Sequence, residues 1–194
     1  MGIVIFIIII IFIFSIFAIL KLEKHEVKYV KSTIDNKEYL VRDLQDKQQS
    51  ANNLALLRRN IMTLVDHLYI NKDKKYKDFK SDIEQLKTRI SDVIINESSE
   101  DSSYTSYSVN KGEQIVFCLR SKYTNYLHDI NLVMYVALHE MAHVACKEYG
   151  HTDLFKKIFA FITKVAIELG LYTKIDFKND PVEYCGLIIS ESIV

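Results

Sequence analysis

The sequence predicts an α+β protein that is mostly helical. Apolar residues recur at helical spacing over two long segments, a further apolar segment carries closely spaced histidines, and short β-prone runs flank a glycine-containing turn. The 194 residues include 25 basic and 25 acidic side chains, and this zero net charge argues against a nucleic-acid partner. One proline and five glycines exclude a collagen-like or Pro/Gly-rich disordered chain.

The N-terminal segment predicts a membrane anchor. Residues 3–20 are apolar except for Ser15, and a helix of this length spans about 27 Å, close to the hydrocarbon thickness of a bilayer. A cleaved signal peptide has a basic start and small residues before the cleavage site, and neither feature is present here. We therefore expect residues 1–20 to form an uncleaved transmembrane helix that contacts the membrane through residues 3–20.

The charges that follow the anchor predict its orientation. Lys21, Lys24, Lys28 and Lys31 come after the apolar run, and no lysine or arginine precedes it. By the positive-inside rule, the body of this single-pass protein then lies on the cytoplasmic side of the membrane. The sequence Asn96-Glu97-Ser98 is a glycosylation sequon that matters only if the body is lumenal.

The middle of the chain predicts a helical region. Residues 21–40 mix charged and apolar side chains and are interpreted as a juxtamembrane connector. Within the helical region 41–96, apolar spacings of three and four predict one helix from Leu40 to about Tyr69 and a second over Tyr76–Val93. These helices can form an antiparallel hairpin or a short coiled coil with a partner. A Ser-rich acidic stretch over 97–103 predicts a flexible linker.

The remaining residues, 104–194, form the predicted core domain, and it begins with a β-hairpin. Two β-prone runs, Tyr104–Val109 and Gln114–Leu119, flank a three-residue loop of sequence Asn-Lys-Gly. The segment 131–150 then predicts one long helix, which an asparagine begins and a glycine ends.

This helix carries the motif that predicts chemistry, HExxH. His139 and His143 are four residues apart, so both imidazoles project from one helix face and reach one metal ion at about 2.0–2.1 Å. Glu140 lies about 100° around the helix, where it can handle the proton of a metal-bound water. Burying two histidines and a glutamate in an apolar helix is costly without a metal or polar partners. The motif therefore predicts a metal site.

A catalytic zinc ion needs a third protein ligand and an open fourth position. Tyr149 occupies the position at which one class of HExxH protein has its third histidine, so that class is excluded. His151 directly follows the helix-ending glycine, and Thr152 can begin a new helix that runs to Leu169. A turn at this point can bring His151 back to the metal. The alternative ligand is Glu168, from the following helix, and His151 is favoured over it.

The three cysteines predict no disulfide framework. Cys118, Cys146 and Cys185 are few and widely scattered, and no CxxC pair is present, so a reducing compartment is the simpler hypothesis. Cys146 follows His143 by three residues and is expected in the core rather than as a fourth ligand. For Tyr149 and Tyr184, packing is favoured over stabilisation of an oxyanion. The other histidines, His25, His67 and His128, are not expected to bind the metal.

The motif and its surroundings resemble a known family. HEMAH followed by GHTDLF resembles the HExxH…HxxxF core of the WLM and SprT-like metalloproteases, which are zincins with a compact catalytic domain. The hairpin SYSVNKGEQIVFCLR and the later PVEYCG are similar to a WLM-like version found in large DNA viruses, and the resemblance covers about residues 104–186. It implies Zn²⁺ as cofactor and Glu140 as general acid/base. The zinc ligands that it implies are His139, His143 and His151.

The sequence thus predicts a membrane-anchored zinc metallopeptidase that hydrolyses peptide bonds by glutamate-assisted attack of zinc-bound water. Its substrate is expected to be a protein or peptide, added as an extended strand along Gln114–Leu119. The alternative is a non-catalytic membrane-tethered adaptor with a zincin-like domain and a partner-binding helical hairpin. Glu140 argues against the adaptor, because a structural metal site has no use for that carboxylate beside an open position.

Overall fold

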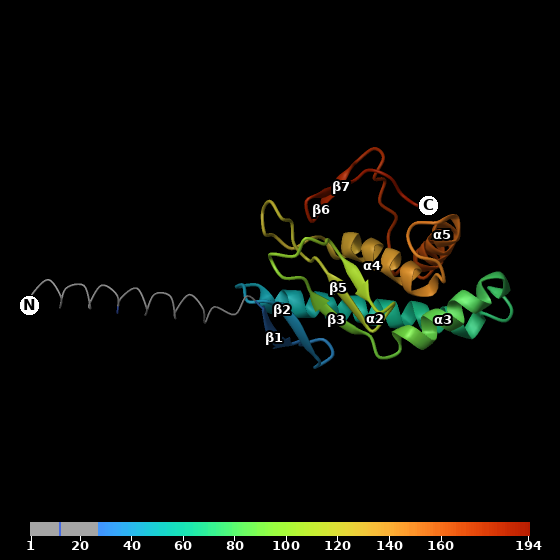
Figure 1. Cartoon of the computed structure of the whole chain (residues 1–194), viewed down its shortest axis with the longest axis horizontal. Coiled ribbons are helices and arrows are strands. Elements are labelled where there is room, and N and C mark those ends of the chain that lie inside the picture. Colours follow the sequence, from blue (N-terminus) through green and yellow to red (C-terminus); the bar gives the residue numbers. More distant parts are fainter. Residues whose placement is uncertain (1–11, 13–26) are drawn as a thin grey trace, which may run out of the picture.

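The computed structural model describes Phe12 and residues 27–194 (Figure 1). The described residues form four α-helices and three small sheets, which confirms the predicted α+β class. The predicted anchor over residues 1–20 lies outside the described part except for Phe12. Among the residues described, no helix combines the length and the apolar character needed to cross a bilayer.

A β-hairpin opens the described chain and includes part of the predicted connector 21–40. Strand β1 (Val27–Lys31) pairs antiparallel with β2 (Glu38–Arg42). The second strand alternates, and its inward side chains Tyr39 and Val41 are buried in the main core. Because one face of the hairpin is covered in this way, its charged residues Lys28, Lys31 and Glu38 lie on the solvent side.

The predicted helical hairpin is present. Helix α2 (Lys47–Asn71) runs out from the β-hairpin, and the short 3₁₀-helix η1 (Lys77–Phe79) leads into α3 (Lys80–Ile90), which returns alongside α2 (Figure 1). The second helix ends at Ile90, before the predicted Val93, because the chain turns there into a strand. Helix α2 buries an apolar stripe at helical spacing. Its members include Leu54, Leu57, Ile61, Leu64 and Leu68.

A three-stranded sheet follows, with the order β3-β5-β4. Strand β3 (Ile94–Glu97) is parallel to β5 (Gln114–Phe117), and β4 (Tyr107–Val109) is antiparallel to β5. The predicted hairpin is therefore correct, although its turn has four residues, 110–113, because Val109 pairs with Gln114. Glu97, the first residue of the predicted linker 97–103, is instead buried at the end of β3.

The expectation that the second hairpin strand, Gln114–Leu119, offers a free edge is wrong. Strand β5 lies in the centre of the sheet, between β3 and β4. Its residues Ile115 and Phe117 are completely buried, as is typical of a strand covered on both sides. The edge of this sheet beside the next helix is β4.

Helix α4 (Ile130–Ala145) lies inside the protein, in contact with α2, α3, β4, β5 and the following helix α5 (Asp153–Glu168) (Figure 1). Its cap is Asp129 rather than the predicted Asn131, since the Asp129 carboxylate accepts a hydrogen bond of 2.8 Å from the Asn131 amide. The helix stops short of the predicted end at residue 150, because Cys146 adopts an extended conformation.

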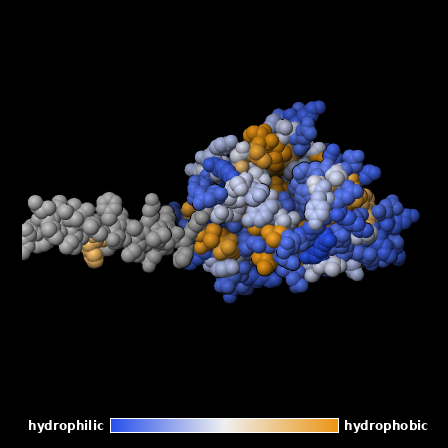
Figure 2. Space-filling model, in the orientation of Figure 1, coloured by the Kyte–Doolittle hydropathy of each residue, from blue (hydrophilic) through white to orange (hydrophobic). Residues whose placement is uncertain are grey.

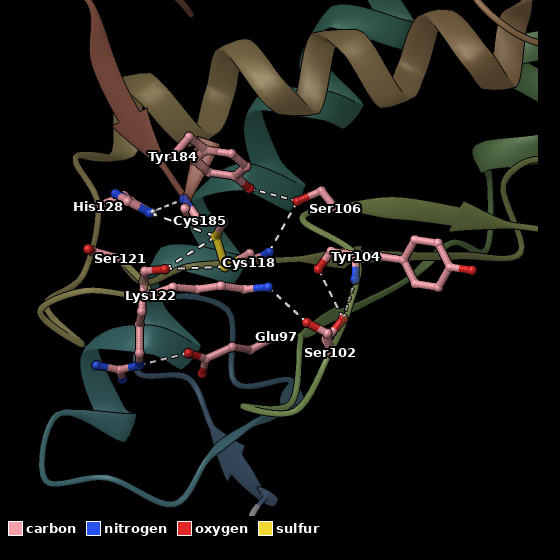
Figure 3. Close-up of a disulfide and its surroundings, with 12 residues drawn as sticks. Glu97, Ser102, Tyr104, Ser106, Cys118, Ser121, Lys122, His128, Tyr184 and Cys185 are labelled. Atoms are coloured by element: carbon pink, nitrogen blue, oxygen red, sulfur yellow. Dashed lines mark hydrogen bonds and ion pairs between the residues drawn. A yellow bond between two sulfur atoms is a disulfide. The ribbon is translucent and has the colours of Figure 1, made fainter. Parts of the chain in front are cut away.

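A C-terminal hairpin, β6 (Val182–Tyr184) and β7 (Leu187–Ile189), completes the fold. The expectation that the cysteines remain unpaired is wrong for Cys118 and Cys185, which form a disulfide between the end of β5 and the turn of this hairpin (Figure 3). The bond closes a long loop and is expected to stabilise the fold by about 2–4 kcal/mol. Strand β7 carries the exposed apolar patch near the top of Figure 2.

A buried arginine joins the two halves of the chain. Arg120 is 2% exposed, and its Nε donates to the Glu97 carboxylate at 2.8 Å. Its two Nη atoms each donate to the Asp46 carboxylate at 2.8 Å, and one of them also donates to Ser50 Oγ. These hydrogen bonds lower the pKa of Asp46. Arg120 thereby fastens the start of α2, the end of β3 and the chain beyond β5 to one another.

We predict that Arg120→Met strongly destabilises the protein, because it leaves the Glu97 carboxylate buried without its cation. Breaking a buried ion pair from one side typically costs about 3–5 kcal/mol. The control is Lys87→Met, which removes an exposed ion pair of 2.6 Å with Asp66 and should cost at most about 1 kcal/mol. Denaturant unfolding measures both values. A loss as small for Arg120→Met as for the control would contradict this account.

Candidate metal centre

Three histidine side chains converge at the surface of α4. His139 and His143 project from one face of the helix, and His151 approaches them from the turn that follows. The Nε2–Nε2 distances are 3.1 Å between His139 and His143, 3.2 Å between His143 and His151, and 3.1 Å between His151 and His139. Within the described residues, these histidines form the one group of three or more side chains with metal-ligating spacing.

This arrangement fits a zinc ion. Tetrahedral zinc with Zn–N bonds of about 2.0–2.1 Å places its nitrogen ligands about 3.3 Å apart, close to the observed separations. Hydrogen bonds among the rings do not explain the cluster equally well, since each neutral imidazole donates through a single nitrogen and three mutual contacts cannot all be satisfied. The donor set therefore suits a cation held by three imidazoles, with one side left open.

Burial keeps two of these rings neutral. It lowers the pKa of His139 to about 3 and that of His143 to about 4, with further lowering by the other two histidines at His139 and by His151 and Lys111 at His143. The neutral imidazole is the form that binds metal ions.

One aromatic side chain packs against all three rings. The centroid of the Phe155 ring lies 5.0 Å from that of His139, 4.2 Å from that of His143 and 4.9 Å from that of His151. Phe155 is held in the first turn of α5, where its amide donates to the Oγ1 of the capping residue Thr152 at 3.3 Å. The predicted cap is thus confirmed, and the phenylalanine four residues after His151 has a physical role in orienting the imidazoles.

Glu140 lies beside the cluster and faces strand β4. Its side chain is 5% exposed, and burial raises its pKa to about 7, partly opposed by a hydrogen bond from the backbone amide of Ser108. The bond from the edge strand fixes the carboxylate next to the imidazoles without making it part of the three-histidine group. Strand β4 therefore serves to orient Glu140.

The end of α4 is held by side chains from α3, a feature that the sequence did not reveal. The Gln85 Nε2 donates to the carbonyl oxygens of Val144 at 3.1 Å and of Ala145 at 2.7 Å. Arg89 Nη1 donates to the same Val144 carbonyl at 3.1 Å. The last carbonyl groups of a helix have no hydrogen-bond partner within it, and burial of α4 keeps water from them. The bonds from Gln85 and Arg89 therefore satisfy these acceptors. The helical hairpin thus supports the helix that carries the motif.

A pocket of about 830 Å³ opens over the cluster. Its floor is α4 with the three histidines and Glu140, and strands β4 and β7 contribute to its walls. The buried Tyr184 also lines it and shares a hydrogen bond of 2.6 Å with Ser106 Oγ, which in turn accepts one from the Cys118 amide (Figure 3). The disulfide next to Tyr184 therefore fixes this wall. The apolar lining includes Tyr135, Val136, Phe159, Leu187 and Ile189.

Other residues considered from the sequence lie elsewhere. Glu168, the alternative third ligand, is exposed near the far end of α5 and forms an ion pair of 2.9 Å with Lys75. His67 bonds the hydroxyl of Tyr76 at 3.1 Å, and His128 accepts a hydrogen bond of 3.2 Å from the Cys185 amide. His25 lies outside the described residues, and Cys146 is buried and free as predicted. The expectation that Tyr149 packs in the core is wrong, since its side chain is 84% exposed.

Comparison with known proteins finds relatives in viruses. The chain is 49% identical over 174 residues to Uncharacterized protein R325 of Acanthamoeba polyphaga mimivirus, an alignment that covers 90% of this chain and 88% of the relative. It is 29% identical over 167 residues to Uncharacterized protein 136R of Invertebrate iridescent virus 6, covering 80% of this chain and 85% of that protein. A third relative, Uncharacterized protein 042R of Invertebrate iridescent virus 3, is 42% identical over 84 residues, covering 42% of this chain and 50% of that protein.

No protein-family profile matches the chain, and no solved structure matches it. The extent and identity of the first alignment are sufficient to establish common descent along nearly the whole chain. The chain belongs to the same family as Uncharacterized protein R325 of Acanthamoeba polyphaga mimivirus.

Proposed function

We propose that this protein is a zinc-dependent metallopeptidase. The observation that carries the proposal is the convergence of three imidazoles beside a buried glutamate, on the floor of an open pocket. His139, His143 and His151 would hold the ion, and zinc bound there supplies a Lewis acid that polarises a peptide carbonyl and activates water. The resemblance of HEMAH and GHTDLF to the WLM and SprT-like zincin core supports the same assignment.

Glu140 acts in this proposal as the general acid/base. Its carboxylate accepts a proton from the attacking water and delivers it to the leaving amine of the cleaved peptide. The backbone amide of Ser108 holds the carboxylate in place, and its burial keeps competing solvent away. A glutamate in this position gives the site a use beyond structural metal binding, which favours the enzyme over the non-catalytic adaptor.

The shape of the pocket favours a protein or peptide substrate. It is lined by strand β4, helix α4 and strand β7, together with the turn after α4 and with Phe159 of α5 and Tyr184 of β6. The walls combine residues of the edge strand β4 with apolar side chains such as Val136 and Leu187, a mixture that suits an extended chain with apolar residues. The neutral net charge gives no electrostatic support to nucleic acid as the ligand.

The first test concerns the ligands. We predict that His151→Ala loses zinc about as severely as His139→Ala, because each removes one of three nitrogens that meet at one point. Glu168→Ala should retain zinc, since Glu168 is paired with Lys75 away from the cluster. Metal stoichiometry after dialysis, measured by atomic emission, distinguishes these results. Loss of zinc from Glu168→Ala alone would refute the assignment.

The second test concerns catalysis. Glu140→Gln keeps the size and hydrogen-bonding capacity of the side chain but cannot accept the proton, so we predict unchanged zinc content and a fall in turnover of about 10²-fold or more. The matched control is Glu168→Gln, which changes an exposed glutamate outside the pocket. Zinc content, melting temperature and cleavage of unfolded protein substrates are measured for all three proteins.

Equal turnover in the wild type and Glu140→Gln would exclude the proposed role of this carboxylate. Absence of cleavage by zinc-loaded wild type across a broad panel of proteins and peptides would favour the adaptor, whose partner would then be sought on the helical hairpin α2–α3.

We also propose that residues 3–20 anchor the protein in a membrane, with the body on the cytoplasmic side, because four lysines follow the apolar run. The disulfide between Cys118 and Cys185 is the observation that opposes this orientation and the expected reducing compartment, since such bonds are rare in the cytosol. The sequon at Asn96 is a poor reporter of orientation, since this side chain is 8% exposed and accepts a hydrogen bond from the Leu40 amide. We predict that the full chain floats with lipid vesicles and that a protease added outside sealed microsomes digests residues 27–194. Complete protection of this part in sealed microsomes would reverse the orientation.

A further inference from the structure

The backbone that leads to His151 is bonded by a side chain from another part of the fold, Lys111. Between the end of α4 and the start of α5, the chain passes through residues 147–151. Among the residues that the structure describes, no backbone–backbone hydrogen bond involves this segment. His151 is itself exposed, so little burial fixes it. Its position beside the other two imidazoles therefore depends on contacts made by side chains.

Phe155 packs on the His151 ring, and Lys111, in the turn between β4 and β5, bonds the backbone that precedes it. Its Nζ donates to the carbonyl oxygens of Cys146 at 3.0 Å and Lys147 at 3.2 Å, with a longer contact of 3.4 Å to that of Glu148. The same ammonium lies 4.1 Å from the centroid of the Tyr149 ring. An ammonium has three donors and no acceptor, so three consecutive carbonyl groups match its bonding capacity. The cation also lies where the negative end of the α4 dipole favours it.

The backbone of the turn that carries Lys111 adopts an unusual conformation and packs closely against two helices. Asn110 and Lys111 have φ values of 48° and 53°, in the left-handed region that few lysines occupy. The next residue, Gly112, has φ of 121°, and a Cβ there would lie 3.0 Å from Val144 Cγ1 and 3.1 Å from the Arg89 carbonyl oxygen. The turn is therefore pressed against α4 and α3. Strained residues persist where surrounding contacts hold them.

We propose that Lys111 is a positioning residue that holds the segment 147–151 so that His151 completes the metal site. The inference rests on the proposed metal centre and adds to it a residue outside both the HExxH motif and the following helix. Without the ammonium, the carbonyl oxygens of this segment accept hydrogen bonds from water instead. His151 is then no longer held beside His139 and His143. Loss of a group that orients a ligand typically lowers metal affinity by about 10–100-fold.

The decisive variant is Lys111→Asn. Asparagine adopts the left-handed conformation more readily than lysine, so the turn is retained while the ammonium is removed. The control is Lys147→Asn, which removes the same charge from an exposed side chain in the same segment. Lys111→Arg restores a cationic donor and should recover part of the affinity. Melting temperatures of the metal-free proteins show whether each variant is folded.

The first measurement is the zinc dissociation constant, by competition with a chromophoric chelator. We expect about a tenfold or greater increase for Lys111→Asn and no comparable change for Lys147→Asn. A second measurement needs no metal: chymotrypsin cleavage after the exposed Tyr149, followed on reducing gels of the metal-free proteins. Cleavage should be faster for Lys111→Asn than for the wild type, because the segment has lost its fastening.

A double-mutant cycle separates positioning of His151 from a general effect on stability. If Lys111 acts through His151, then Lys111→Asn should weaken zinc binding little further in a protein that already carries His151→Ala, whose weak two-histidine site is titrated at high zinc with a weaker chelator. An equal weakening in both backgrounds would overturn the proposal, as would zinc affinity and cleavage equal to those of the Lys147→Asn control. In those cases zinc binding by the wild type still supports the metal centre. Failure of the wild type to bind zinc would overturn both.

Discussion

The burial of α4 is the constraint from which the rest of the architecture follows. This helix carries polar functional groups, yet it is surrounded by helices and by the sheet, so each polar atom needs a partner within the protein. The Glu140 carboxylate finds the amide of Ser108 in β4. The carbonyls at the end of the helix find Gln85 and Arg89. The imidazoles of His139 and His143 face the pocket together with Glu140, and a metal ion there would satisfy their free nitrogens.

This constraint gives the N-terminal half of the protein a function in the site. Helix α3 does more than cover apolar surface, because two of its side chains bond the backbone at the end of α4. The buried Arg120 then ties the start of α2 to the sheet. The helical hairpin that the sequence allowed as a partner-binding module is thus joined by hydrogen bonds to the helix of the candidate metal centre, and the described chain shares one hydrophobic core.

Local patterns in the sequence predicted the parts of the site that depend on local geometry. The i, i+4 spacing of His139 and His143 determines that they share a helix face, and Thr152 begins α5 because a threonine hydroxyl can cap a helix. The same local reasoning predicted that His151 lies near the other two histidines, because the turn between the two helices is short. The helical hairpin followed from apolar periodicity, although the ends of its helices did not.

The remaining features depend on contacts between residues far apart in the chain. The pairing of Cys118 with Cys185 spans 67 residues and has no local signature. The parallel pairing of β3 with β5 removes the expected edge strand, and only the sheet order reveals this. Lys111 looked like an ordinary turn residue. A lysine before glycine in a tight turn gives no indication of what its side chain reaches, so its contacts with the segment after α4 required the structure.

The disulfide also determines what happens when the backbone is broken. It joins Cys118, before α4, to Cys185, after α5, so both helices lie inside one covalent ring. A single nick in the exposed segment between these helices places His139 and His143 on one fragment and His151 on the other. The disulfide still links the two fragments, and the packing of α4 against α5 keeps the helices together. A chain with this architecture can therefore be cut once between α4 and α5 and still keep all three histidines in one covalently linked molecule.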